Sequence, residues 1–259
     1  MKKIWDAIND GTIYSCPSLL ASFVVLSFAD LKKYKFSYWF AFPAIHSKPV
    51  WRLSSSVPRG NGGADSGSAG GSSSVNSQVS RKLTSQESTT LVEAVQTWRY
   101  EVDARQYGFF LAKKVPRSMA EGGDQGREEA GSELDFEWRI STLSSYEADF
   151  FNGSEEQDCF VCFADPSNYD DAPGWVLRNL LALVQRRWKL RRVQLLRYRD
   201  VHSRRDQGRS VVMTLETDDG PTPETDITSM PKVTGWERNS AGKLSGRTVD
   251  LKEYMDPKR

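Results

Sequence analysis

Two cysteines, Cys159 and Cys162, have the spacing of a redox pair or of half a zinc site. That chemistry favours the start of a helix, whereas this pair lies inside an apolar, strand-like run. Residues three apart on a strand point to opposite faces of a sheet, about 10 Å apart. No second pair of this spacing occurs, and His46 and His202 are isolated in the sequence. We therefore interpret the cysteines as small buried strand residues and the histidines as structural or exposed.

Two glycine-containing stretches are similar to parts of phosphate-binding loops. In residues 60–65 an aspartate, Asp65, occupies the third glycine position, and the surrounding low-complexity sequence provides no strand leading into the loop. Gly242 and Lys243 match the end of a P-loop, but Leu244 replaces the serine or threonine that contacts Mg²⁺. Nucleotide binding by this chain is therefore not expected.

One segment, residues 186–200, interleaves basic residues with aromatic ones, a combination found in nucleic-acid-binding surfaces. The basic residues are Arg186, Arg187, Lys189, Arg191, Arg192, Arg197 and Arg199, and the aromatic ones are Trp188 and Tyr198. Two other interpretations stay open: solvated outer faces of a helix end and a strand, or a site for an acidic protein segment. The formal net charge of +1 argues against a polyanionic partner for the chain as a whole.

Residues 22–45 form the most apolar and aromatic part of the chain. The apolar runs 23–29 and 38–45 are each too short for a membrane-spanning helix, which needs about 20 residues. Their β-branched and aromatic residues predict two strands that belong to a sheet core. The turn between them is charged, with Lys32, Lys33 and Lys35, and is expected to be exposed.

Helical and strand-like patterns alternate along the rest of the chain. Apolar spacing and capping signals predict helices over 3–11, 84–98, 143–151 and 177–188. Apolar runs predict strands over 107–112, 158–164, 193–198 and 210–215, and the C-terminal residues are typical of a hairpin. This order favours an α/β fold in which helices cover both faces of a mixed β-sheet, a three-layer sandwich.

Composition sets further limits. Residues 54–80 and 116–131 are polar and glycine-rich, so we expect two long flexible insertions. Three cysteines, an odd number, suit a reducing compartment rather than a disulfide framework. The N-terminal residues lack the apolar core of a signal peptide. A cytoplasmic location is the expectation.

Five blocks of sequence then point to a family. They are, in order, KIWDAINDGT, LSFADLKKYKFSYWFAFPA, DPSNYDDAPGWVLRNLLAL, VTGWERN and MDPKR. Together they resemble the N-terminal region of the autophagy enzymes that activate ubiquitin-like modifiers. The resemblance runs from Lys3 to Arg259 and is weak between Ser54 and Leu134.

The resemblance implies a division of labour within the full-length enzymes. Members adenylate a modifier with ATP, hold it as a thioester on a cysteine and pass it to a conjugating enzyme. ATP binding, thioester chemistry and homodimer formation belong to a C-terminal domain that would begin where this chain stops. We therefore expect no catalytic residue, metal or cofactor here. Residues 1–20 would be a helix left from a first subdomain, and residues 21–259 a second, α/β subdomain.

The leading hypothesis is a recruitment module. The expected partners are autophagy conjugating enzymes, with the modifier reached only indirectly, no membrane and no nucleic acid. The resemblance also suggests the pre-autophagosomal structure as a location. Charge alone nominates the contact residues, which are Lys32, Lys33, Lys35, Arg186, Arg187, Arg191, Arg192 and Arg197. The alternatives are one chain of a split activating enzyme, a nucleic-acid binder using the basic segment, and a fragment without independent function.

Overall fold

The structure is a computed structural model that describes residues 1–54, 80–117, 136–169, 172–217 and 230–255. Its larger sheet has seven strands in the order β3-β9-β8-β7-β5-β6, with β4 also paired to β9. Among the described strands of this sheet, β7 and β8 alone run parallel, so the sheet is mixed. Its strands are β3 (Trp51–Leu53), β4 (Ser80–Lys82), β5 (Phe109–Pro116), β6 (Phe136–Ser141), β7 (Cys159–Ala164), β8 (Arg192–Tyr198) and β9 (Val211–Thr217).

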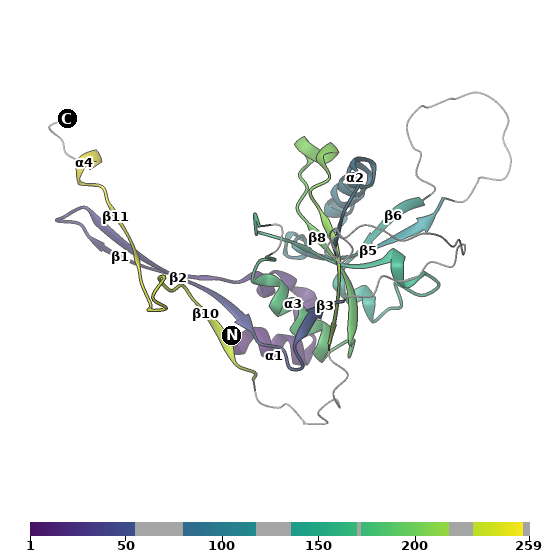
Figure 1. Cartoon of the computed structure of the whole chain (residues 1–259), viewed down its shortest axis with the longest axis horizontal. Coiled ribbons are helices and arrows are strands. Elements are labelled where there is room, and N and C mark those ends of the chain that lie inside the picture. Colours follow the sequence, from purple (N-terminus) through teal and green to yellow (C-terminus); the bar gives the residue numbers. More distant parts are fainter. Residues whose placement is uncertain (55–79, 118–135, 170–171, 218–229, 256–259) are drawn as a thin grey trace, which may run out of the picture.

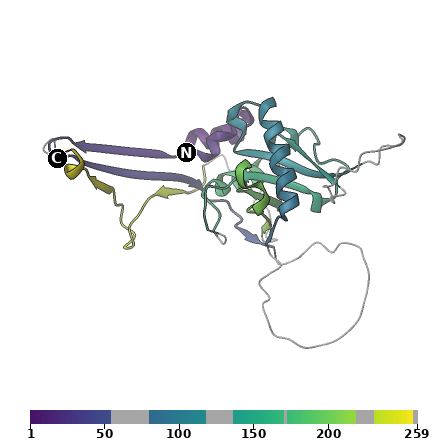
Figure 2. The ribbon, with the colours of Figure 1, turned by 90° about the horizontal axis from the view of Figure 1, so that it is seen from above.

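Helices cover both faces of this sheet, which confirms the predicted three-layer arrangement (Figure 2). The α-helices in the described residues are α1 (Lys2–Asp10), α2 (Ser85–Glu101), α3 (Val176–Arg186) and α4 (Lys252–Met255). Short 3₁₀ helices are η1 (Thr12–Ser15), η2 (Pro17–Ala21), η3 (Ala104–Gln106), η4 (Leu143–Tyr146), η5 (Glu156–Asp158) and η6 (His202–Gln207). One core cluster joins α2 to the sheet, and a second joins α1 and α3 to the opposite face.

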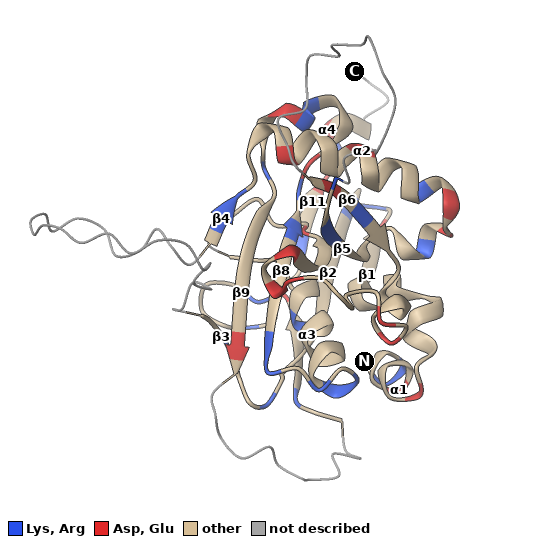
Figure 3. Cartoon of the chain, turned by 90° about the vertical axis from the view of Figure 1, so that its right-hand side faces the viewer, with Lys and Arg blue, Asp and Glu red and all other residues tan. Residues whose placement is uncertain are grey.

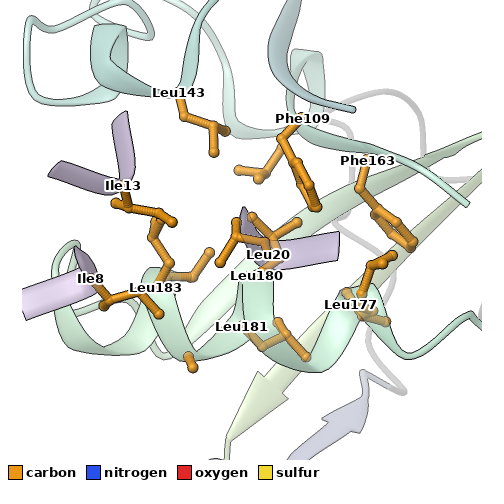
Figure 4. Close-up of a cluster of buried hydrophobic side chains, with 14 of the residues drawn as sticks. Ile8, Ile13, Leu20, Phe109, Leu143, Phe163, Leu177, Leu180, Leu181 and Leu183 are labelled. Atoms are coloured by element: carbon orange, nitrogen blue, oxygen red, sulfur yellow. The ribbon is translucent and has the colours of Figure 1, made fainter. Parts of the chain in front are cut away.

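The alternation of side chains along β7 explains why two cores form. Phe160 and Cys162 point into the cluster under α2, whereas Val161 and Phe163 point into the cluster under α3. On α3, the predicted stripe Leu177, Leu180, Leu181 and Val184 is buried, with Leu180 fully buried. Figure 4 shows Leu177 beside Phe163 and Leu180 on the side of α3 that faces Phe109.

The first twenty residues are part of the same core. Ile8 of α1, Ile13 of η1 and Leu20 of η2 are fully buried against α3 (Figure 4). Helix α1 ends at Gly11, whose φ of +85° is the left-handed conformation that glycine adopts at low cost. The sequence-based division at residue 20 remains a prediction, but these residues share one continuous core with α3 and the larger sheet.

A second, smaller sheet forms an arm that extends from the α/β body (Figures 1 and 2). It contains β1 (Val24–Asp30), β2 (Lys35–Ile45), β10 (Val233–Trp236) and β11 (Arg247–Asp250). β1 is an edge strand whose only neighbour among the described strands is β2, while β10 and β11 both pair with β2. The predicted C-terminal hairpin is therefore wrong in its pairing: apart from a single bridge between Arg238 and Leu244, these strands add to β2.

The prediction that β1 and β2 belong to a sheet core is wrong for most of their length. Strand formation was predicted correctly, but Val24, Leu26 and Phe28 of β1 are 45, 52 and 63% exposed. The buried residues of β2 are Ala41, Ala44 and Ile45, all in the half of the strand nearest the body. The charged turn at Lys32 and Lys33 is exposed, as expected. No helix in the described residues is long and apolar enough to cross a membrane.

Of two helices predicted from local signals, one is confirmed and one is wrong. The capping box of α2 is present, with Thr84 and Glu87 exchanging hydrogen bonds. The predicted helix 143–151 is reduced to the 3₁₀ turn η4 and irregular turns after it. The predicted insertions lie outside the described residues, except at their ends.

Strands β3 and β4 are two parts of one edge strand. Leu53 pairs with Leu215, the Ser54 amide donates to the Thr214 carbonyl at 2.9 Å, and Ser80 pairs with Met213. The chain thus leaves the edge of β9 after Ser54 and returns at Ser80 in the next register position. In the sequence, residues 55–79 stand between Ser54 and Ser80, which face consecutive residues of β9.

Glu87 lies at the start of α2 and joins several elements. It is 6% exposed and accepts hydrogen bonds from Arg81 at 2.7 Å, Lys114 at 2.8 Å and the Thr84 amide at 2.9 Å. Its backbone carbonyl accepts from the indole of Trp138. Burial alone would raise the pKa of Glu87, but these donors outweigh it and lower the pKa from 4.5 to about 2.

Deleting residues 55–79 should preserve the fold. Joining Ser54 to Ser80 keeps every pair with β9, and removing the closure entropy of a long segment should raise the free energy of unfolding by roughly 1–2 kcal/mol. Urea unfolding measures this. Deleting 55–80 instead is the matched control, because it shifts β4 by one residue and reverses its faces. Equal stability of the two deletions would contradict the interrupted-strand interpretation.

Glu87 should make the free energy of unfolding fall as the pH is lowered. Since its pKa is lowered on folding, its stabilisation is complete above its unfolded pKa of about 4.5 and disappears as the pH falls towards 2. Between pH 6 and pH 3 the native protein should lose about 2 kcal/mol through this group. Urea titrations of Glu87→Gln should show a shallower pH dependence than those of the exposed control Glu101→Gln. Identical pH profiles would count against the assignment.

Candidate functional site

A pocket of about 550 Å³ opens where the parallel strands β7 and β8 end. In open α/β sheets, ligands bind at this edge, outside the carboxyl ends of parallel strands. We call it the strand-end pocket. It is lined by Val92, Gln96 and Arg99 of α2, by Ala164 at the end of β7 with Asp165 and Pro166 after it, and by Tyr198 at the end of β8 with Arg199, Asp200, Val201 and His202 after it.

Asp165, which lines the strand-end pocket, belongs to a buried ion pair with Arg197. The Arg197 guanidinium contacts the Asp165 carboxylate at 2.7 Å, with both side chains almost fully buried. Asp165 also accepts from the amides of Ser167 at 3.0 Å and Gly174 at 2.9 Å, and Arg197 donates to the Tyr169 carbonyl. The pair therefore fixes the loop between β7 and α3 against β8. Arg197, nominated from charge as a contact residue, is used inside the fold.

The remaining basic residues nominated from sequence lie on separate elements (Figure 3). Arg186 and Arg187, at the end of α3, bind α1: Arg186 donates to Asn9 at 2.8 Å, and Arg187 donates to the carbonyls of Ile8 and Asn9. Arg187 also pairs with Glu147 at 3.0 Å. The hydrogen bond that Glu147 accepts from Arg187, followed by the one from Tyr14, lowers the pKa of Glu147.

Arg191 and Arg192 lie at the opposite end of β8 from Arg197. Arg191 is exposed, and Arg192 pairs with Glu156 at 3.2 Å. Lys32, Lys33 and Lys35 lie at the tip of the arm, where Lys33 and Lys35 make exposed ion pairs with Asp30 and Asp250. The structure thus divides the nominated residues among α3, the two ends of β8 and the arm. Partner contact by them remains a prediction.

Comparison with known proteins identifies the family. The family model described as the N-terminus of the ubiquitin-like modifier-activating enzyme ATG7 matches residues 1–255. The ATG7 enzyme of Ajellomyces capsulatus is 56% identical over 275 residues, covering all of this chain and 36% of the relative. That of Sordaria macrospora is 49% identical over 258 residues, covering all of the chain and 33% of the relative.

The chain belongs to the ATG7 N-terminus family. It spans about a third of the length of the relatives that it matches. Among solved structures, it is similar to the Kluyveromyces marxianus Atg7NTD in its complex with Atg10, with 19% identity and a TM-score of 0.46, over 96% of this chain and 68% of that one. The same domain alone gives 18% identity and a TM-score of 0.45, over 97% and 70%.

ATG7 relatives are named as activating enzymes, and a thioester would need a reactive cysteine. Cys159 is partly buried and Cys162 fully buried, on opposite faces of β7. Burial raises the pKa of both thiols, that of Cys162 well above its usual value, so neither resembles an activated nucleophile. His46 contacts Thr234 at 2.9 Å and His202 contacts Arg205. The described residues contain no cluster suited to a metal ion.

ATP chemistry in the ATG7 family would require a phosphate cradle. Gly242 and Lys243 lie in an exposed turn, where the Lys243 amide donates to the Asn239 side chain. β10 comes before this turn, but the element after it is the strand β11 and not the helix that a P-loop needs. Gly242 and Lys243 therefore do not form a loop that could hold the phosphates of a nucleotide. The other glycine stretch, 60–65, falls outside the described part of the chain.

Removing one member of the buried ion pair should destabilise this ATG7-family domain strongly. Arg197→Met leaves the Asp165 carboxylate buried without its counter-ion, at a cost of about 3–5 kcal/mol. The double variant Arg197→Met with Asp165→Asn should recover much of that loss, since the amide carries no charge and still accepts from the Ser167 and Gly174 amides. Urea unfolding at neutral pH tests both. A double variant no more stable than the single one would show that the uncompensated charge is not the cause.

Proposed function

We propose that this chain is a recruitment domain that holds an autophagy conjugating enzyme, so that a modifier can pass to it from the activating enzyme. Membership of the ATG7 N-terminus family is the observation that carries the proposal. The adenylation with ATP, the thioester step and homodimer formation would be performed by the remaining two thirds of a full-length relative. A cytoplasmic location, including the pre-autophagosomal structure, accompanies this role.

The geometry supports binding rather than catalysis by the described residues. On the side of β1 away from β2, the arm presents a strand edge that no described strand covers, with exposed apolar side chains, and such surfaces mark interaction sites in soluble proteins. The arm tip adds exposed lysines, and the end of β8 adds Arg191 and Arg192. The arm alone therefore offers a partner an apolar contact and a charged tip.

Calorimetric titration of the purified chain with Atg10 tests the proposal, because Atg10 is the protein crystallised with the Kluyveromyces marxianus domain. We expect saturable one-to-one binding that weakens as salt rises. A chain that is folded by circular dichroism yet releases no heat and shows no co-elution with either Atg10 or the second autophagy conjugating enzyme would overturn the proposal.

Charge reversal distinguishes the two nominated surfaces. Arg191→Glu with Arg192→Glu probes β8, and Lys32→Glu with Lys33→Glu probes the arm tip. If a surface touches an acidic partner, its charge-reversal variant should bind that partner about tenfold more weakly, mainly because association is slower. The affinity of that variant should also depend less on salt. Surface plasmon resonance at two salt concentrations measures this. Unchanged rates for a pair would remove that surface from the interface.

A further inference from the structure

Strand β1 forms one edge of the arm and lacks the usual protection against pairing with a further strand (Figures 1 and 2). Its seven residues pair with β2 in one unbroken register from Val24 to Asp30, so no bulge twists the edge away. The strand contains no proline and no lysine, and Asp30 at its end is its single charged residue. Such an edge is suited to accept another strand.

The edges of the larger sheet are protected where β1 is not. At one edge, β6 carries Glu137 and Arg139, which form an ion pair with each other. At the other edge, β3 and β4 have three residues each. Charged side chains and short strands both discourage pairing with another chain. Among the described edge strands, β1 therefore stands out as both long and apolar.

The sequence of β1 is complementary to itself. If a second copy of β1 lies antiparallel to it about Ser27, then Ser27 faces Ser27, Leu26 faces Phe28 and Val25 faces Ala29. Each facing pair consists of two even-numbered or two odd-numbered residues. The backbone groups that point away from β2 in one copy therefore meet the same kind of groups in the other. This register also uses the whole length of both strands.

The residues next to the strand ends fit the same register. Phe23 would lie near Leu31 of the second copy, and these side chains are 60 and 69% exposed, so their contact would remove apolar surface from water. Asp30 would face Val24 and already has a counter-ion in its own arm, Lys33 at 3.5 Å. The antiparallel orientation sends the two lysine-bearing tips in opposite directions. No like charges therefore face each other across the pair.

We propose that this chain forms a homodimer through its arms, in which two copies of β1 pair antiparallel about Ser27 and join the two arms into one continuous sheet. Backbone hydrogen bonds and cross-strand side-chain pairs would hold it together. Because seven residues make a small interface, we expect a reversible dimer with a dissociation constant of about 10 µM. This contact is separate from the homodimer that the family resemblance assigns to a C-terminal domain.

Analytical ultracentrifugation of the purified chain, from about 1 to about 200 µM, tests the dimer. The average mass should rise with concentration from 29.2 kDa towards twice that value. Ser27→Lys places two ammonium groups opposite each other on the two-fold axis and should weaken dimer formation about tenfold. Ser203→Lys is the matched control, because it adds the same charge at an exposed position of η6, and it should dimerise as the native chain does.

Cross-linking tests the register. Directly facing residues of an antiparallel pair have Cα atoms about 4.5–5.5 Å apart, which a disulfide can bridge. Ser27→Cys should therefore give a covalent dimer on a non-reducing gel when oxidised glutathione takes up the two electrons. Val24→Cys is the matched control, because in this register the two Val24 positions lie about 20 Å apart. The native chain shows how much cross-linking its own cysteines give.

Three results would overturn the proposal. One is a constant mass of 29.2 kDa over the whole concentration range. Another is equal dimer formation by Ser27→Lys and Ser203→Lys, which would place self-association on a different surface. The third is a Ser27→Cys chain that cross-links no more than Val24→Cys. None of these measurements contains Atg10, so a failed dimer leaves the recruitment function standing, and a failure to bind Atg10 leaves the dimer standing.

Discussion

One buried amide joins the arm to the body. Asn179 of α3 is fully buried, accepts from the Ile45 amide at 3.0 Å and donates to the carbonyls of Leu20 and Pro43 at 2.8 and 2.9 Å. It thereby satisfies backbone groups at the base of β2 and at the end of η2, where no strand or helix partner in the described residues reaches them. This side chain therefore helps to set the direction in which the arm leaves the body. It also holds the end of η2 against α3.

The body itself depends on how β7 and β8 come together. A parallel pair needs a crossover, and α3 supplies it while burying its apolar stripe on one face of the sheet. The loop that leads into α3 is fixed by Asp165 and Arg197. Helix α3 covers one face of the sheet and α2 covers the other. The ends of β7 and β8 are left uncovered between these helices, and Arg99 and His202 of η6 line the pocket there. The pocket is thus a by-product of the topology.

Sequence patterns predicted the elements whose signals are local. Thr84 and Glu87 indicated α2, and the spacing from Leu177 to Val184 indicated α3. What the patterns missed depends on neighbours far along the chain. An apolar β-branched run predicts a strand but does not say whether anything covers it, so it does not distinguish the exposed β1 from a core strand. Likewise Arg197 looked like a surface charge, because its partner Asp165 lies 32 residues earlier. Arg99 carried no signal, since only the fold places it at the strand ends.

The pairing of the arm has a consequence for biosynthesis. β1 and β2 leave the ribosome well before β11, since Ser37 of β2 meets Thr248 of β11, 211 residues later. Pairing over such a separation forms slowly and late. Until β11 has been made, the nascent chain therefore displays an apolar hairpin with open edges, the kind of species that chaperones recognise. The arm, whose first strands are made early, is among the last parts of the domain to be completed.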